Sequence, residues 1–192
     1  MKSVLISIQP YWVFLIIAKM MGWNVPQEKT IEVRKTFPTA DNWNKVAKIY
    51  CSKDKRSFSR IPKEYRPMME RFLGKVLGEF VCDTFVVDKT FGHDPLFLAA
   101  ACMGEVEAAA YCTNPEMYGW HISELKIYDE PKELRKLIRV CSEWEKEEIT
   151  PKCHKCDHYF TSWAECYAGC DCDGELPVTR PPQSWCYVEE AG

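Results

Sequence analysis

The chain has 192 residues, of which 46% are hydrophobic and 13% aromatic, so it can bury a sizeable core and its composition argues against global disorder. A formal net charge of -3 argues against sequence-independent binding of duplex DNA, which depends on many phosphate contacts. Residues 45–66 nevertheless carry eight lysines and arginines against two acidic residues. Either a local basic patch or a solvated loop with scattered charges would explain this segment.

The cysteine count and the N-terminal segment both indicate where in the cell the protein is expected. Eleven cysteines are an odd number in a chain that is long for a disulfide-stapled module, which indicates a reducing cytoplasm. The apolar residues 11–18 are too few to span a bilayer, and no small-x-small cleavage site follows them. We therefore expect a cytoplasmic protein with a buried helix in this segment and no membrane partner.

Hydrophobic periodicity and turn residues predict the elements in chain order. The first half is predicted to contain a strand at 3–8, a nearly all-apolar helix at 10–21, strands at 30–36 and 46–52, a basic loop at 53–61, a helical segment at 62–73 and a long strand at 74–87. The second half is predicted to contain short helices at 95–101 and 105–112, a strand at 118–128, a helix at 131–140 and a last strand at 178–190. Glu79 stands within the long apolar strand, so we expect Arg34 or Lys29 as its partner, or else exposure to solvent.

The strand that follows the first helix is short, β-branched and strongly charged. Ile31 and Val33 alternate with Thr30, Glu32 and Arg34, so one face can pack on a core and the other presents a carboxylate and a guanidinium. Two opposite charges on one strand face are often a solvated face or a structural ion pair. They are also the groups that a polar binding site needs.

Gln27, Lys29, Glu32 and Arg34 stand at the spacing of the signature G-x-K-x-x-E-x-R, with Gln27 in place of the glycine. On these residues the chain resembles the ASCH domain, a small β-barrel related to PUA domains. The order of elements fits over residues 3–129 and 178–190, and the segments around Trp120 and Trp185 extend the resemblance to ASCH proteins encoded by phages and Firmicutes.

The resemblance implies an α+β fold: a PUA-like (ASCH) β-barrel with flanking helices, as one domain over residues 1–192. A Cys-rich insertion at about 141–176 would precede the final strand at 178–190. Such barrels carry a cleft suited to RNA or a modified nucleoside, in which aromatic faces stack on bases and polar groups bind base edges. The residues expected at this cleft are Lys29, Glu32, Arg34, Trp120, His121, Arg180, Gln183, Ser184 and Trp185, with Tyr187 as a further wall. Taken singly, the tryptophans also suit core packing, and His121 suits a structural role.

A second reading makes the protein an enzyme. Some small ASCH proteins are amidohydrolases that remove the acetyl group from acetylated cytidine, with a lysine that matches Lys29 in the chemistry. Their threonine nucleophile is replaced here by Glu32, which could instead act as a base toward water. A later glutamate, Glu105 or Glu107, would assist. The sequence leaves open whether the protein is a binding module or a hydrolase.

The last third of the chain is rich in cysteine and histidine. Cys153 and Cys156 form a C-x-x-C pair, which is half of a tetrahedral zinc site. A second pair could come from Cys166, Cys170 and Cys172, of which we expect Cys170 and Cys172, and His154 and His158 are alternative ligands. A structural zinc would order an insertion that is too small to have its own core. The alternative is a loop with free thiols. In a third functional reading, this insertion is the contact surface for a protein partner of a phage-encoded interaction module.

Overall fold

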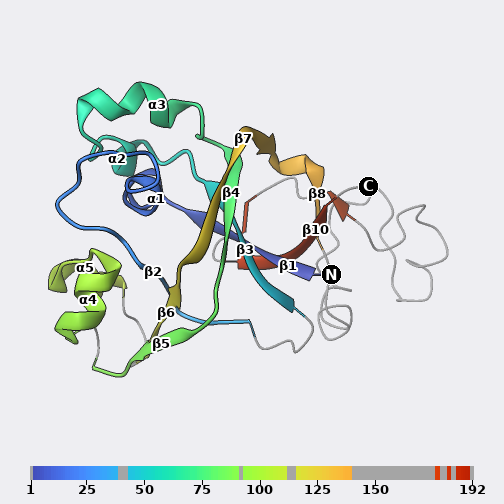
Figure 1. The fold of residues 1–192 in the computed structure, drawn as a ribbon. Helices are drawn as coiled ribbons and strands as arrows, with labels where there is room; N and C mark the ends of the chain where they lie inside the picture. Colours follow the sequence, from blue (N-terminus) through green and yellow to red (C-terminus); the bar gives the residue numbers. More distant parts are fainter. Residues whose placement is uncertain are drawn as a thin grey trace.

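The computed structural model describes residues 2–38, 43–90, 93–111, 116–139, 176–177, 181–182 and 185–190. The described strands form a larger and a smaller sheet, with helices packed beside them (Figure 1). The larger sheet contains β1 (Lys2–Ile8), β3 (Trp43–Cys51), β4 (Lys75–Val81), β7 (Ser123–Glu133), β8 (Leu137–Arg139), β9 (Leu176–Pro177) and β10 (Trp185–Glu190). The smaller sheet contains β2 (Ile31–Arg34), β5 (Phe85–Asp88) and β6 (Met117–His121).

The seven-stranded sheet has the order β7-β4-β3-β1-β10-β8-β9, and the three-stranded sheet has the order β2-β6-β5. The helices and 3-10 turns are α1 (Pro10–Ile17), α2 (Lys55–Phe58), η1 (Lys63–Tyr65), α3 (Arg66–Glu70), α4 (Pro95–Ala101), α5 (Glu105–Tyr111) and η2 (Leu134–Lys136). The α+β class is confirmed. Within the described residues, the strands divide between two sheets and do not close into the barrel that the resemblance implied. No described helix has the length and apolar character needed to cross a membrane.

One antiparallel ribbon joins the two sheets. β4 pairs with β7 in the larger sheet, and β5 pairs with β6 in the smaller one. Residues 82–84 separate β4 from β5, and Ile122 alone separates β6 from β7. The ribbon therefore passes from one sheet to the other at the same point on both of its strands (Figure 1). The strand predicted at 74–87 is accordingly two strands, in two different sheets.

Helix α1 begins at Pro10, where the missing N–H leaves no donor unsatisfied. The helix ends at Ile17, and a turn continues to Gly22, whose φ of +66° lets Trp23 N donate back to Ala18 O at 2.8 Å. The helix is thus shorter than the predicted 10–21. Its burial on several sides is confirmed, since α1 contributes Val13, Phe14, Leu15, Ile16 and Ile17 to the main core.

Three local predictions differ from the structure. Residues 131–140 do not form a helix, because Lys132 and Glu133 still pair with β4 and the chain then continues through η2 into β8. Strand pairing satisfies the backbone there and overrides the local helical pattern. Residues 53–61 include α2, which Asp54 caps by accepting a hydrogen bond from Ser57 N at 3.0 Å. Residues 181–182, inside the strand predicted at 178–190, are not in a strand, and β10 begins at Trp185.

The charged partner of Glu79 also differs from the prediction. Glu79 Oε2 lies 3.1 Å from Lys48 Nζ and accepts a hydrogen bond of 2.6 Å from Tyr128, so neither Arg34 nor Lys29 is its partner. The reason is topological: β4 lies in the larger sheet beside β3 and β7, whereas the strand that carries Arg34 lies in the smaller sheet. Because Lys48 is buried in this pair, the cations of residues 45–66 do not share one surface.

The close approach of β7 to β4 gives a test of the larger sheet. A Cβ at Gly78 would lie 2.3 Å from the backbone oxygen of Lys126, which no side-chain rotation can relieve. We expect Gly78→Ala to destabilise the protein by roughly 1–3 kcal/mol, measured by urea denaturation. Gly104→Ala is the matched control because a Cβ there meets nothing within 4 Å. Equal stabilities of the two variants would contradict the observed approach of the strands.

Candidate functional site

Both faces of β2 are buried, including the charged one. Ile31 and Val33 pack with Phe97 and Leu98 of α4 and with Ala108 of α5. Glu32 and Arg34 point to the other face and are also buried. This excludes a solvated charged face and leaves a structural ion pair or a binding site as explanations for the charges.

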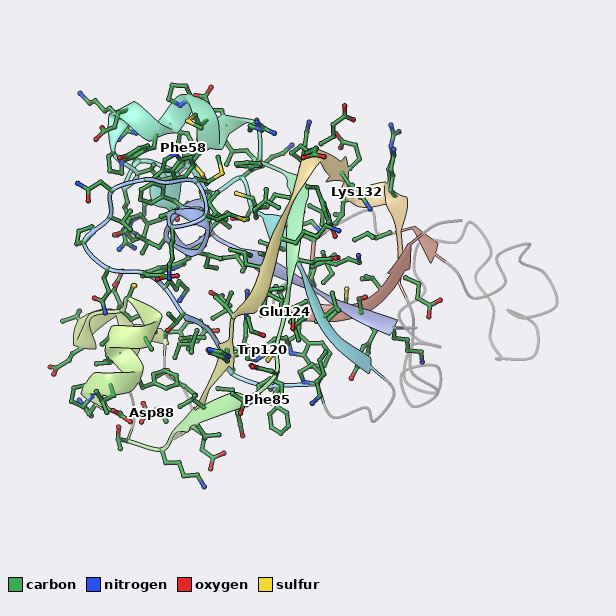
Figure 2. The ribbon with its side chains drawn as sticks, in the orientation of Figure 1. Phe58, Phe85, Asp88, Trp120, Glu124 and Lys132 are labelled. Carbon is green, nitrogen blue, oxygen red and sulfur yellow. The ribbon has the colours of Figure 1, made fainter. Side chains whose placement is uncertain are left out.

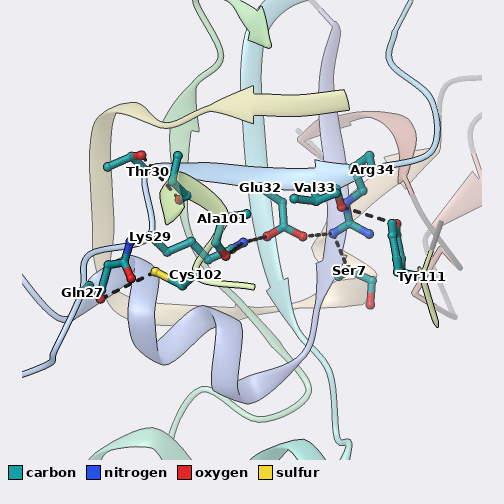
Figure 3. Close-up of polar contacts among 11 residues, drawn as sticks. Ser7, Gln27, Lys29, Thr30, Glu32, Val33, Arg34, Ala101, Cys102 and Tyr111 are labelled. Carbon is teal, nitrogen blue, oxygen red and sulfur yellow. Dashed lines mark hydrogen bonds and ion pairs between the residues drawn. The ribbon is translucent and has the colours of Figure 1, made fainter. Parts of the chain in front are cut away.

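The three signature charges form one linked cluster, which we call the buried charged cluster: Lys29, Glu32 and Arg34 (Figure 3). Lys29 Nζ lies 3.5 Å from Glu32 Oε2, and Arg34 Nη2 lies 3.0 Å from Glu32 Oε1. Their side chains are 2%, 7% and 7% exposed. Arg34 Nη2 also donates to Ser7 O of β1 at 2.7 Å, which ties the small sheet to the large one.

Two atoms of the buried charged cluster lack the partners that buried polar atoms normally have. Glu32 Oε2 and Arg34 Nε find no hydrogen-bond partner among the described residues. The distance of 3.5 Å from Glu32 Oε2 to Lys29 Nζ suits an ion pair and is long for a hydrogen bond. Buried polar groups are otherwise almost always hydrogen-bonded, so one acceptor and one donor here are available to a water molecule or a ligand.

Lys29 has a structural partner as well as Glu32. Its ammonium donates to Ala101 O at 2.8 Å, at the C-terminal end of α4, where a cation is favoured. It also lies 5.0 Å from the centre of the Trp12 ring. Burial lowers the pKa of Lys29 below its usual 10.5, and the nearby carboxylate of Glu32 opposes that shift.

The loop before β2 is fastened to the same end of α4. Gln27 Nε2 donates to Ala99 O at 2.6 Å, and Thr30 N donates to Ala100 O at 2.9 Å. Gln27, which replaces the glycine of the signature, thus uses its side chain to hold α4. The carbonyl groups of α4 that bind this loop were not predicted from the sequence, and no side-chain pattern could have identified them, because every residue carries a carbonyl.

Trp120 lies on the same face as the charged cluster, and His121 lies on the other face. Glu32 pairs directly with Trp120 and Ile31 pairs with His121, and successive residues of a strand alternate between faces. Trp120, which is labelled in Figure 2, comes from β6. It is 0% exposed and donates to Thr36 O at 3.2 Å, so its ring packs in the core and offers no free face to a base. His121 Nδ1 lies 2.6 Å from Asp83 Oδ1, and this hydrogen bond lowers the pKa of Asp83.

Trp185 of β10 reaches the same region from the other sheet. Its Nε1 donates to Thr36 Oγ1 at 3.0 Å, and its ring centre lies 6.2 Å from that of Trp120. Thr36 therefore accepts from both tryptophans. Glu107 pairs with Arg60 at 2.8 Å, and the hydrogen bonds and ion pairs of the buried charged cluster do not include it.

Other predicted site residues lie outside the described residues, and predictions about them stay predictions: Arg180, Gln183, Ser184, Cys153, Cys156, Cys170 and Cys172. Among the described residues there is no group of three or more histidine, cysteine or acidic side chains that could hold a metal ion. The predicted zinc site and the predicted protein contact through the insertion are therefore untested.

The lowered pKa of Lys29 predicts a pH dependence. Between its pKa in the folded protein and 10.5, the unfolded chain holds a proton that the folded protein has released, so stability rises with pH in that window. The free energy of unfolding of the wild type minus that of Lys29→Met should therefore increase as pH approaches 10.5, by at most about 1.4 kcal/mol per pH unit. Urea denaturation between neutral pH and 10.5 measures this difference. A constant difference would show that the amine is not desolvated.

Comparisons with known proteins find similarity among solved structures. No protein-family model matches the chain, and no curated protein matches it. The chain is similar to the crystal structure of ASCH from Zymomonas mobilis, with 16% identity, coverage of 97% of this chain and 87% of that chain, and a TM-score of 0.45. Crystal structures of two mutants of that protein match at 14% and 15% identity, with TM-scores of 0.44 and 0.46, over 97% of this chain and 90% and 88% of theirs. These similarities are to solved ASCH structures, and the likeness to phage and Firmicutes ASCH proteins stays a prediction.

Proposed function

We propose that the chain binds RNA or a modified nucleoside at the buried charged cluster of Lys29, Glu32 and Arg34. The observation that carries this proposal is that two buried polar atoms on one strand face, Glu32 Oε2 and Arg34 Nε, have no hydrogen bond among the described residues. A structural ion pair alone would explain the contact between Glu32 and Arg34. It leaves each residue with a further polar atom that has no hydrogen bond among the described residues, and a bound ligand would satisfy both atoms.

The chemistry of these two atoms suits the edge of a nucleobase. Glu32 Oε2 can accept a hydrogen bond and Arg34 Nε can donate one. A base edge that presents a donor beside an acceptor would satisfy both, as cytosine does with its exocyclic amine and its ring acceptors. The bond of 3.0 Å between Arg34 and Glu32 Oε1 holds the carboxylate in place for this contact.

Access to the cluster requires side chains or backbone to move. The three side chains of the cluster are only 2–7% exposed, so a ligand can reach Glu32 only after the structure opens locally. The gain from satisfying two buried polar atoms would then offset the cost of that opening. Binding of this kind is expected to be slower than diffusion allows, because the competent state is a minor one.

The binding proposal predicts a specific loss in two variants. Calorimetric titration of the wild type with cytidine, acetylated cytidine and a short single-stranded RNA should show binding of at least one of them. Glu32→Gln removes the anionic acceptor and Arg34→Lys removes the Nε donor. We expect each variant to weaken that binding at least about tenfold, which is the usual effect of losing one good polar contact to a base.

Glu79→Gln is the matched control for this experiment. Glu79 is also a carboxylate paired with a lysine and lies in the larger sheet, where Lys48 and Tyr128 both bond its Oε2. This variant should keep wild-type affinity. Equal losses in Glu79→Gln and Glu32→Gln would mean that the effect is general destabilisation, and an absence of binding by the wild type would reject the proposal.

Hydrolysis of an acylated nucleoside is the second candidate, and the environment of Lys29 favours it. Its amine is buried with a lowered pKa and lies 3.5 Å from Glu32, so a proton can be held or released at Nζ beside a carboxylate. In such a reaction water adds to the acyl carbonyl carbon with Glu32 as base. The bond from that carbon to the exocyclic amine of the nucleobase then breaks. The amine leaves with a proton as acetate is released.

Chromatography of acetylated cytidine incubated with the protein tests this candidate. A hydrolase would release cytidine and acetate in equal amounts, Lys29→Ala would abolish the release, and Glu79→Gln would retain it. No release at high protein concentration would reject hydrolysis of this substrate and leave binding as the function of the cluster.

A further inference from the structure

We propose that Arg60, held over the rings of Tyr11 and Trp12, forms a phosphate-binding subsite next to the buried charged cluster. This inference rests on the proposed function and makes it narrower. It assigns the ligand to the phosphate-bearing class, a nucleotide or an RNA strand, and not to the free nucleosides.

Arg60 is placed by the helix before it and by two aromatic rings. Its Cζ lies 3.9 Å from the centre of the Tyr11 ring and 5.0 Å from that of Trp12. Tyr11 N donates to Ser57 Oγ at 3.0 Å, which fastens the start of α1 to α2. A guanidinium stacked on aromatic rings keeps its in-plane N–H donors available for a planar or tetrahedral anion.

Trp12 connects Arg60 to the buried charged cluster. The centre of its ring lies 5.0 Å from Arg60 Cζ and 5.0 Å from Lys29 Nζ. The two cations are therefore separated by no more than twice that distance, a span that a nucleoside monophosphate can bridge. A ligand whose base reaches Glu32 would pass along the Trp12 ring and present its phosphate near Arg60.

The guanidinium of Arg60 already holds an anion. Arg60 Nη1 lies 2.8 Å from Glu107 Oε1 of α5, across α1, which lies between α2 and α5 in Figure 1. Both side chains are 39% exposed, so this ion pair is solvated and weak. A phosphate offers more charge and more acceptor oxygens than the carboxylate and can displace it. Glu107 thus occupies the place that the ligand phosphate would take.

A purely structural role for Arg60 makes a different prediction. If Arg60 only fastens α2 to α5, its loss would lower stability and would affect every ligand alike. A phosphate subsite instead affects only ligands that carry phosphate. The ratio of nucleotide affinity to nucleoside affinity therefore separates the two roles, because opening or destabilisation of the fold cancels in this ratio.

The experiment is calorimetric titration of the full chain with cytidine and with cytidine monophosphate at matched ionic strength. We expect the monophosphate to bind at least about tenfold more tightly to the wild type, as a charge-assisted contact would give. Arg60→Gln should reduce this ratio to near one and leave cytidine affinity unchanged. Glu107→Gln should increase the ratio, because it removes the competing carboxylate. Added salt should weaken the binding of cytidine monophosphate more than the binding of cytidine.

Arg71→Gln is the matched control. Arg71 also lies 5.0 Å over an aromatic ring, that of Phe72, and donates to the backbone oxygen of Asp129 at 3.0 Å. This variant should keep the wild-type ratio. An unchanged ratio in Arg60→Gln, or an equal loss for both ligands, would overturn the phosphate subsite while leaving the proposed function in place. If the wild type bound none of cytidine, acetylated cytidine, cytidine monophosphate and RNA, the proposed function would fail and the subsite with it.

Discussion

The carboxylate of Glu32, held between two cations on a buried strand face, is the interaction on which the rest of this site depends. Its oxygens form ion pairs with Arg34 Nη2 at 3.0 Å and with Lys29 Nζ at 3.5 Å. Arg34 also donates a hydrogen bond to the backbone oxygen of Ser7, and Lys29 donates one to that of Ala101. The cluster therefore links β2 to the large sheet and to α4. Buried ion pairs contribute little net stability, yet removing one partner leaves an uncompensated charge and costs about 3–5 kcal/mol. The cluster therefore constrains where β1, β2 and α4 can lie.

The ion pair of Glu79 and Lys48 differs from the buried charged cluster in how completely its carboxylate is hydrogen-bonded. Glu79 in the larger sheet has two donors on one oxygen, Lys48 and Tyr128, and this contact lowers the pKa of Glu79 against the opposing effect of burial. Glu32 has one oxygen without a donor among the residues that the structure describes. Both carboxylates pair with lysine. The Glu79 oxygen in that contact is hydrogen-bonded, whereas the corresponding Glu32 oxygen is not. An incomplete polar network in a protein interior is costly, which is why we interpret it as a place for a ligand.

The surroundings of the cluster suggest how charge and aromatic surface act together. Trp12 is within 5.0 Å of both the buried amine of Lys29 and the half-exposed guanidinium of Arg60, measured to its ring centre. Trp120 and Trp185, in contrast, are fixed by their hydrogen bonds to Thr36 and support the core. Aromatic residues near a site thus differ in role according to whether their ring faces are covered. Trp12 differs from these two in that it lies beside the exposed guanidinium of Arg60.

Much of the local structure and the shared strand face of Glu32 and Arg34 could be predicted from the sequence, because both follow from the periodicity of the chain. Alternation in β2 placed Glu32 and Arg34 on one face, and Gly104 correctly divided α4 from α5. Only the tertiary structure decided that the charged face is buried, that Glu79 pairs with Lys48, and that residues 131–133 extend a strand. The physical reason is that periodicity is a property of neighbouring residues, whereas burial, ion-pair partners and strand register depend on which distant segments meet. The position of Arg60 over Tyr11 and Trp12 belongs to this second kind, since packing of α2 on α1 brings these residues together.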